Sequence, residues 1–287
     1  MQWVWKCRDR MMTSTDAPLV MGILNVTPDS FSDGGRFAEP AQAVDAGLRL
    51  LEEGADLLDV GGESTRPGAP AVDGNEEARR VVPVIEAICR QRPDALVSVD
   101  TMKAAVAERA LAAGAAIVND VSALSADARM AGVAAASKAG VILMHMRGTP
   151  RTMQEAPHYD DAAAEIHDYL AARVKDLEAQ GLDPRCLAVD PGIGFGKTVD
   201  HNLQLLAGLD GLVGLGRPVV VGASRKSFIG RLTGREVGER LAGSLAVAAF
   251  SALHGAAVLR VHDVSATVDA VRMLKALRAA GTAGKTA

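Results

Sequence analysis

Short apolar runs alternate with longer amphipathic stretches from Val20 almost to the end of the chain. The apolar runs are rich in Val, Ile and Leu, which is typical of strands that are buried on both faces. The expected strands span residues 20–26, 56–60, 96–100, 117–121, 141–146, 187–190, 218–222 and 258–262. The expected helices span residues 41–53, 75–90, 103–113, 126–139, 161–180, 201–207, 240–253 and 266–279.

This regular alternation of strand and helix predicts parallel strands joined by helical crossovers. Glycines stand where helices are expected to stop before the next strand, at Gly54, Gly114, Gly140, Gly181 and Gly255. Eight such units in about 250 residues match the size of a (β/α)₈ barrel. An open doubly wound sheet is the competing interpretation, but the first strand-to-helix turn lacks a G-x-G-x-x-G fingerprint. We therefore expect a single α/β domain, a TIM barrel with a parallel eight-stranded core, over residues 17–281.

The two ends of the chain fall outside this repeat. Residues 1–16 contain no apolar run and no cleavage site of a secretory signal, and we expect a disordered N-terminal extension. The alternative is that Trp3 and Trp5 dock on the body of the protein. Residues 282–287 are expected to form a flexible C-terminal tail.

Composition narrows the possible partners. There are 31 Lys and Arg against 35 Asp and Glu, a net charge of −4, which argues against a nucleic acid or an anionic membrane surface as partner. The longest weakly polar run, residues 241–261, is interrupted by Gly, His and Arg, so we expect no membrane span. The 3 cysteines are scattered without metal-ligand spacing, which is typical of a reduced cytoplasmic protein.

Polar residues gather where the expected strands end, and in a barrel those ends form one face. Side chains of a strand alternate between its two faces, so Ser98 shares a face with Asp100, and Arg260 shares one with His262. The residues predicted to point inward near the strand ends are Asn25, Asp100, Asn119, Asp190, Lys226, Arg260 and His262. One such residue alone is more often a satisfied core group, but seven at one end favour a pocket.

The chemistry of these groups divides them into two sets. Asp100, Asn119, Asp190 and Lys226 offer donors and acceptors suited to the edge of a flat, nitrogen-rich heterocycle. The other set, Arg66, Arg260, His262 and Asn25, suits a polyanion, and the amide oxygen of Asn25 is a suitable Mg²⁺ ligand.

Two glycine-containing loops stand out among the strand ends. In the loop over residues 59–68, Gly61 and Gly62 let the backbone approach a ligand, and Arg66 supplies a forked cation. The loop over residues 192–197 lacks the spacing of a phosphate-binding loop, and we interpret it as a tight turn that places Phe195.

Eight segments together resemble the dihydropteroate synthase family. They are GILNVTPDSFSDGG at 22–35, DVGGESTRPG at 59–68, SVDT at 98–101, ND at 119–120, MHM at 144–146, DPGIGFGK at 190–197, SRKSFIG at 224–230 and RVHDV at 260–264. They follow the family's order and span nearly the whole expected barrel. The resemblance implies a TIM-barrel transferase of folate synthesis that joins 6-hydroxymethyl-7,8-dihydropterin diphosphate to p-aminobenzoate, and that sulfonamides target.

The resemblance also implies a role for each matching residue. Catalytic roles fall to Asp100, Lys226 and Arg66. The implied pterin site comprises Asp100, Asn119, Met146, Asp190, Lys226 and Arg260. The implied diphosphate site comprises Asn25, Thr65, Arg66, Arg260 and His262, with Asn25 as the Mg²⁺ ligand. The implied p-aminobenzoate site comprises Phe31, Thr65, Pro67, Phe195 and Ser227.

The resemblance further suggests a homodimer formed through the late helices. Three alternatives stay open: a pterin-dependent methyltransferase barrel, a Schiff-base aldolase that uses Lys226, and a non-catalytic pterin-binding paralogue. The first would not need the segments 25–35 and 224–227.

Overall fold

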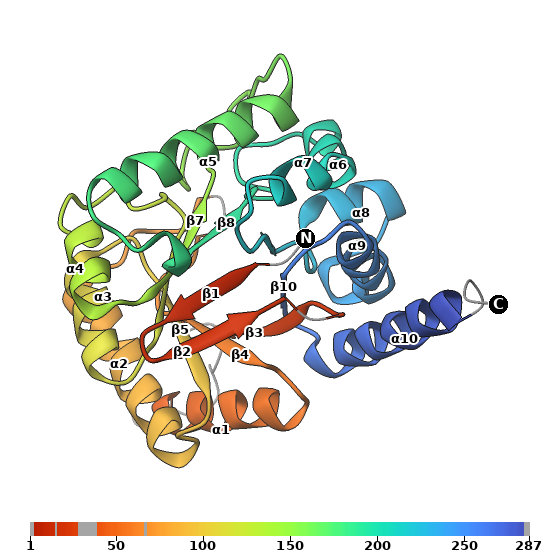
Figure 1. Cartoon of the computed structure of the whole chain (residues 1–287). Helices are drawn as coiled ribbons and strands as arrows, with labels where there is room; N and C mark the ends of the chain where they lie inside the picture. The colour runs from red at the N-terminus through yellow and green to blue at the C-terminus, as the bar shows by residue number, and fades with distance from the viewer. Residues whose placement is uncertain (1–2, 15, 28–38, 66–67, 284–287) are drawn as a thin grey trace.

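A computed structural model describes residues 3–14, 16–27, 39–65 and 68–283. This part of the chain contains an eight-stranded parallel sheet surrounded by helices (Figure 1). Its strands are β3 (Leu19–Asn25), β4 (Leu57–Gly61), β5 (Leu96–Asp100), β6 (Ile117–Asp120), β7 (Gly140–Met144), β8 (Leu187–Asp190), β9 (Val220–Val221) and β10 (Val258–Val261). All eight predicted strands are therefore confirmed, and none of their bounds shifts by more than two residues.

The strands close into a barrel. Their order around the sheet is β8-β7-β6-β5-β4-β3-β10-β9, and a parallel bridge between Val189 and Val219 joins its two ends. The bridge is supported by a hydrogen bond of 2.9 Å from the Val189 amide to the Pro218 carbonyl. The sheet is therefore closed and has no exposed edge. Eight parallel strands in a closed sheet surrounded by helices confirm the predicted α/β TIM barrel.

Helices follow the strands in the expected order. They are α1 (Glu39–Glu52), α2 (Gly74–Gln91), α3 (Ala104–Ala112), α4 (Met130–Ser137), α5 (Ala162–Ala179), α6 (Val199–Ala207), α7 (Leu209–Val213), α8 (Ser227–Thr233), α9 (Leu241–Leu253) and α10 (Val264–Ala283). Local signals set their ends: the Asp73 side chain accepts from the Asn75 amide and caps α2. The short helices α7 and α8 were not predicted, because each offers too few turns for a periodic pattern.

The N-terminal residues differ from the expectation. In place of a disordered extension, β1 (Val4–Cys7) and β2 (Arg10–Thr13) form an antiparallel hairpin that lies across the barrel in Figure 1. Trp5 and Cys7 alternate with exposed or half-buried residues and are fully buried. The Trp5 indole N–H donates to the Cys186 carbonyl at 2.9 Å. The alternative of docked tryptophans is therefore correct: Trp5 is fully buried, and Trp3 is partly buried against the same inner cluster. Burial of these large side chains explains why the hairpin lies on the barrel.

Gly140 shows how closely the hairpin packs. This glycine was expected to end a helix, but it begins β7, and a β-carbon there would clash with Cys7 Sγ. The helix before it, α4, ends at Ser137, and the capping residue Lys138 takes the left-handed conformation with φ 54°. Gly140 is thus required for close approach of the hairpin rather than for a helix end.

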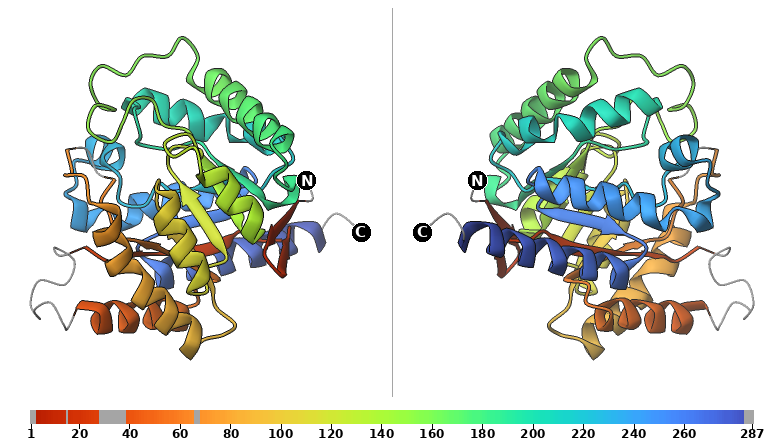
Figure 2. Two further views of the ribbon diagram at one scale, coloured as in Figure 1. Left: turned by 90° about the vertical axis from the view of Figure 1, so that its left-hand side faces the viewer. Right: turned by 90° about the vertical axis from the view of Figure 1, so that its right-hand side faces the viewer.

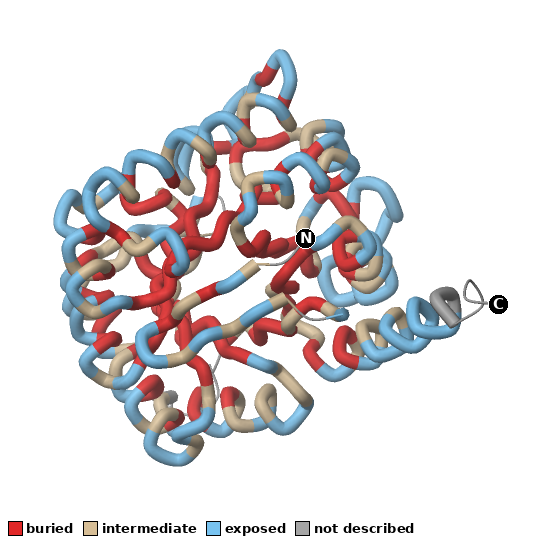
Figure 3. The backbone as a smooth tube through the Cα atoms, viewed as in Figure 1, coloured by how far each residue is buried: buried red, intermediate tan, exposed pale blue. Residues whose placement is uncertain are grey.

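The apolar core has two parts, and Figure 3 shows where the buried residues lie along the chain. The larger part lies between the outer faces of the strands and the surrounding helices, and includes Val60, Val99, Ile85 and Ile166. The smaller part fills the barrel and contains the hairpin residues Trp5 and Cys7. The hairpin covers the end of the barrel at which the strands begin. The opposite end, at which the strands finish, is therefore the expected place for a binding or catalytic site.

The last helix continues beyond the expected boundary. α10 reaches Ala283, and its C-terminal part extends away from the body in Figures 1 and 2. The residues after it, which carry most of the predicted tail, lie outside the described residues. No helix in the described ranges is long and apolar enough to cross a membrane.

Candidate active site

The inside of the barrel is apolar at one end and polar at the other. The lower layer receives one apolar side chain from each strand: Met21, Leu57, Leu96, Ile117, Ile142, Ala188, Val220 and Val258. Because side chains alternate along a strand, the next inward positions lie two residues further on. These positions include Asp59, Asn119, Asp190 and Arg260, and they line the upper half of the barrel.

Arg260 lies at the centre of an ionic network. Its Nε donates to Asp59 Oδ2 at 2.6 Å, and its Nη2 donates to Asp100 Oδ2 at 2.9 Å. Asn119 donates from Nδ2 to the same Asp59 oxygen at 2.9 Å. Asp59 is fully buried and Asp100 is 11% exposed. Two carboxylates from neighbouring strands therefore share one guanidinium, which fixes its plane across the barrel mouth.

The electrostatics of this network are dominated by burial. Desolvation, and then the negative charge of Asp59, raise the pKa of Asp100 to about 7, although Arg260 opposes the shift. The pKa of Arg260 is raised by the two carboxylates against the effect of burial, so the guanidinium keeps its charge. The pKa of Asp100 thus lies near neutral pH, and a pKa shifted in this way is characteristic of groups at functional sites.

A second charged pair lies on the other side of the mouth. Burial lowers the pKa of Lys226 to about 7, while the carboxylates of Asp190 and Asp100 act in the opposite direction. Burial raises the pKa of Asp190, with Lys226 and the Gly192 amide opposing it. That amide donates to Asp190 Oδ1 at 2.6 Å. Lys226 donates to the carbonyl of Ile193, and its Nζ lies 4.5 Å from the ring centre of Phe195.

The third group lies where β3 and β10 end. Asn25 is the last residue of β3, and its register partner on β4 is Gly61. A β-carbon at Gly61 would lie 3.5 Å from Asp100 Cβ and 3.9 Å from Asn25 Oδ1, so this backbone position lies beside both side chains. His262 follows β10, and its Nδ1 lies 3.1 Å from Ser224 Oγ.

The structure thus brings together Asn25, Asp100, Asn119, Asp190, Lys226, Arg260 and His262 at one end of the barrel. Met146 lies in the loop that follows β7, Ser227 begins α8 after the loop that follows β9, and Thr65 lies half-buried after β4. Phe31, Arg66 and Pro67 lie outside the described residues.

Sequence reasoning missed two buried charged residues near this site, Asp59 and Lys197. The alternation that selected the other residues also selects Asp59, because it lies between Leu57 and Gly61 on the inward face of β4. Lys197 is 3% exposed. Nothing in its sequence context distinguishes it from a solvated lysine, since a charged side chain that follows glycine is ordinarily exposed.

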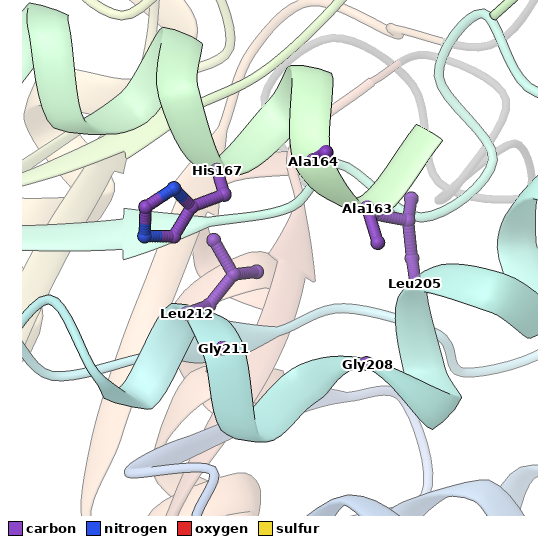
Figure 4. Close-up of a pocket in the computed structure, with 7 residues that line it drawn as sticks. All are labelled: Ala163, Ala164, His167, Leu205, Gly208, Gly211 and Leu212. Atoms are coloured by element: carbon purple, nitrogen blue, oxygen red, sulfur yellow. The ribbon is translucent and has the colours of Figure 1, made fainter. Parts of the chain in front are cut away.

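Two cavities lie outside the barrel mouth. One of about 210 Å³ lies between α5 and the pair α6 and α7 (Figure 4). It is lined by Ala163, Ala164, His167, Leu205, Gly208, Gly211 and Leu212. Another of about 280 Å³ opens between β3 and α1, beside Asn25. The first has a predominantly small and apolar lining, and it lacks the convergent polar groups that the barrel mouth provides.

Metal binding by side chains alone has little support. In the described ranges, no group of three or more His, Cys, Asp or Glu side chains is arranged to hold a metal ion. Asn25 offers a single amide oxygen at the mouth. Mg²⁺ is commonly held by one or two protein oxygens together with phosphate oxygens and water, so this donor suits a metal that arrives with a phosphorylated substrate.

Comparison with known proteins gives this site its family. Residues 21–262 match the model of the pterin-binding enzyme family, so the barrel and its polar mouth are those of a pterin-binding enzyme. The dihydropteroate synthase of Escherichia coli K12 is 48% identical over 259 residues, covering 90% of this chain and 91% of that protein. That of Mycobacterium leprae is 46% identical over 269 residues, covering 91% and 94%.

Solved structures agree with these sequence relatives. A Xanthomonas albilineans dihydropteroate synthase with 4-aminobenzoic acid superposes with a TM-score of 0.91 at 51% identity, over 97% of this chain and 99% of that one. A complex of the Xanthomonas albilineans enzyme with 7,8-dihydropteroate gives 0.87 at 49% identity, over 96% and 99%. The chain therefore belongs to the dihydropteroate synthase family, as its sequence motifs predict.

Proposed function

We propose that this protein condenses 6-hydroxymethyl-7,8-dihydropterin diphosphate with p-aminobenzoate, releasing 7,8-dihydropteroate and pyrophosphate. The observation that carries the proposal is the convergence of Asp100, Asn119, Asp190, Lys226 and Arg260 at the barrel mouth. The relatives support it, since structures of the Xanthomonas albilineans enzyme hold 4-aminobenzoic acid and 7,8-dihydropteroate. Neither the relatives nor the solved structures named above are methyltransferases or aldolases.

The pterin would lie across the barrel mouth. Asp190 and Asn119 offer a carboxylate and an amide to the ring's N–H groups and carbonyl, and Lys226 offers a donor from the opposite side. Arg260 is held flat by Asp59 and Asp100, a geometry that favours stacking on a planar ring. Met146 would pack beside the ring, since it is half-buried at the end of β7.

The diphosphate would lie over the ends of β3 and β10. Asn25, Thr65, Arg66, Arg260 and His262 supply its donors in this proposal. Bound Mg²⁺ would neutralise charge on the leaving diphosphate, with Asn25 as its protein ligand. The second substrate would then enter between the loops after β3, β4 and β8 and the start of α8. There it would contact Phe31, Thr65, Pro67, Phe195 and Ser227.

The reaction follows an SN1-like route in this proposal. The C–O bond to the diphosphate breaks first, and the electron-rich dihydropterin delocalises the positive charge of the methylene carbon. Asp100 in its ionised form stabilises that charge at short range. The amine of p-aminobenzoate then forms the new C–N bond and loses a proton. Exclusion of water matters because water would also react with the cation.

The test is direct product analysis. Purified protein is supplied with the pterin diphosphate, p-aminobenzoate and Mg²⁺, and both dihydropteroate and pyrophosphate are measured. Equal release of the two products, with competition by a sulfonamide against p-aminobenzoate, is expected. Binding of pterin without any product would instead identify a non-catalytic paralogue.

We also propose that the protein is a cytoplasmic homodimer. All three cysteines are free thiols, which suits a reducing compartment. Large apolar side chains are exposed on the late helices, namely Phe250 and Leu253 on α9 and Met273 and Leu277 on α10. Surfaces of this kind commonly bind a second subunit. Sedimentation equilibrium gives the mass, and a monomer at micromolar concentration would contradict the dimer.

A further inference from the structure

Lys197 is a buried lysine for which the proposed chemistry has no role. It ends the loop 192–197 after β8, and only 3% of its surface is exposed. Its Nζ donates to the Phe195 carbonyl at 2.8 Å and to the His145 carbonyl at 3.3 Å. It also lies 3.2 Å from Nδ1 of the His145 ring. An ammonium group has three donors, and three acceptors surround this one.

The surroundings of Lys197 make this arrangement costly. Burial, and then the nearby cation of Lys226, lower the pKa of Lys197 well below its ordinary value. Burial and the cations of Lys197 and Arg147 also lower the pKa of His145, to about 3. His145 is therefore neutral at neutral pH, and its Nδ1 can accept a hydrogen bond. Burying a lysine at such a site disfavours its charged form unless the hydrogen bonds compensate.

The loop that Lys197 closes holds Lys226 in two ways. The Ile193 carbonyl accepts a hydrogen bond from Lys226 Nζ, and the Phe195 ring lies 4.5 Å from the same nitrogen. At Gly194, a β-carbon would lie 2.9 Å from Lys226 Cδ. The position of the loop backbone therefore determines both where the Lys226 ammonium lies and how the Phe195 ring faces the mouth.

The same loop packs directly on the end of β7. A β-carbon at Gly192 would clash with the His145 carbonyl, and one at Gly196 would lie 2.6 Å from the Arg147 carbonyl. Both glycines have positive φ, 68° and 64°. The backbone of the loop after β8 thus contacts the backbone that follows β7 directly. Lys197 adds a hydrogen bond between the two segments, from its Nζ to the His145 carbonyl.

We propose that Lys197 is a positioning residue, whose hydrogen bonds to Phe195 and His145 fix the loop 192–197 and thereby place the Phe195 ring and the Lys226 ammonium. This inference rests on the proposed function, because it assigns Phe195 to the p-aminobenzoate site. Lys197 itself touches neither substrate. Its contribution is to hold a loop that contains three glycines in one conformation.

The experiment is a double-mutant cycle of Lys197→Met and Phe195→Ala. Methionine has a similar length and no N–H donors. In the single variant we expect KM for p-aminobenzoate to rise about tenfold or more, since a displacement of about 1 Å can change rates by two orders of magnitude. In the Phe195→Ala background, Lys197→Met should raise that KM by less than about twofold, because coupled residues are not additive.

Arg8→Met is the matched control. Arg8 is also a cation that donates to two backbone carbonyls, those of Leu111 and Ala115 at 2.9 and 3.0 Å, but it belongs to the N-terminal hairpin turn. We expect it to lower Tm and to leave KM for both substrates unchanged. The comparison distinguishes a general effect of removing a cation that binds backbone carbonyls from the specific effect of removing Lys197 beside the site.

Three outcomes overturn the inference. One is a folded Lys197→Met variant with wild-type KM for p-aminobenzoate, and another is an effect that adds fully to that of Phe195→Ala. If Lys197→Met does not fold, Lys197→Gln, which keeps N–H donors, takes its place in the cycle; failure of both to fold makes Lys197 a residue of stability alone. The proposed function is judged separately, by whether the wild-type protein forms dihydropteroate.

Discussion

Replacing Asp59 by Asn tests the ionic network at the barrel mouth. In the wild-type protein, Arg260 and Asn119 both donate to Asp59 Oδ2, at 2.6 and 2.9 Å. The variant keeps the shape of the side chain and one oxygen that can accept these hydrogen bonds. It removes the negative charge that helps to raise the pKa of Asp100. Of the two carboxylates that contact Arg260, only that of Asp100 remains in the variant. Both changes favour the ionised form of Asp100, so its pKa should fall.

The size of the shift follows from the geometry. The two carboxylate oxygens bind adjacent nitrogens of one guanidinium, so they lie roughly 5 Å apart, where two unit charges repel by about 3 kcal/mol at an effective dielectric constant of about 20. That energy corresponds to about 2 pKa units. The intervening guanidinium screens part of it, and we expect the pKa of Asp100 to fall by about 1 to 2 units from its value of about 7.

The assay is the pH dependence of kcat/KM for the pterin diphosphate, which reports ionisations of the free enzyme and free substrate. The proposed route requires ionised Asp100, so activity should decline as pH falls through about 7 in the wild type. The variant should keep its activity to lower pH. Ionisation of the substrate is the same for both enzymes and cancels in the comparison. An acidic limb at the same pH in both enzymes would refute the proposed coupling of the two carboxylates.

Three further substitutions separate chemistry, metal use and stability. Lys226→Ala should reduce kcat/KM about 100-fold or more, as loss of a preorganised donor commonly does, with an unchanged circular dichroism spectrum; wild-type rates would contradict its role. Asn25→Ala should raise the Mg²⁺ concentration for half-maximal activity about tenfold, and an unchanged metal titration would exclude Asn25 as the ligand. Trp5→Ala should lower the free energy of unfolding by about 3–5 kcal/mol and Tm by roughly 10 °C, measured by thermal melting, whereas an unaltered Tm would show that the hairpin does not stabilise the barrel.

The sequence predicts the barrel well because its signal is local and repeated. Each strand is a short aliphatic run, and each interior position follows from alternation along that run, as Leu57 and Gly61 illustrate. The hairpin has no such repeat. Its order depends on the fit of Trp5 and Cys7 against Gly140 and the Cys186 carbonyl, which are distant along the chain, and contacts of that kind leave no periodic pattern.

The sequence predicts which residue types line the candidate site and which of them point inward. It does not predict which side chains or carbonyls they form hydrogen bonds with. Lys197 shows the difference, since its contact with His145 depends on how the loops after β7 and β8 pack. Asp59 shows it differently. Its inward direction was predictable from alternation, whereas its hydrogen bond to Arg260 joins residues 201 positions apart.

The charge balance around Arg260 narrows how the diphosphate can be stabilised. The resemblance assigns Arg260 to both the pterin and the diphosphate, yet its guanidinium already serves two carboxylates. With Asp100 ionised, this trio carries one net negative charge, which stabilises a cation on the pterin methylene and repels a leaving polyanion. In the proposed reaction, the positive charge beside the diphosphate would therefore come chiefly from the proposed Mg²⁺ and from other groups of the predicted diphosphate set. We therefore expect the proposed reaction to depend on a metal ion, because the ionic network that would favour the cation would repel the leaving diphosphate.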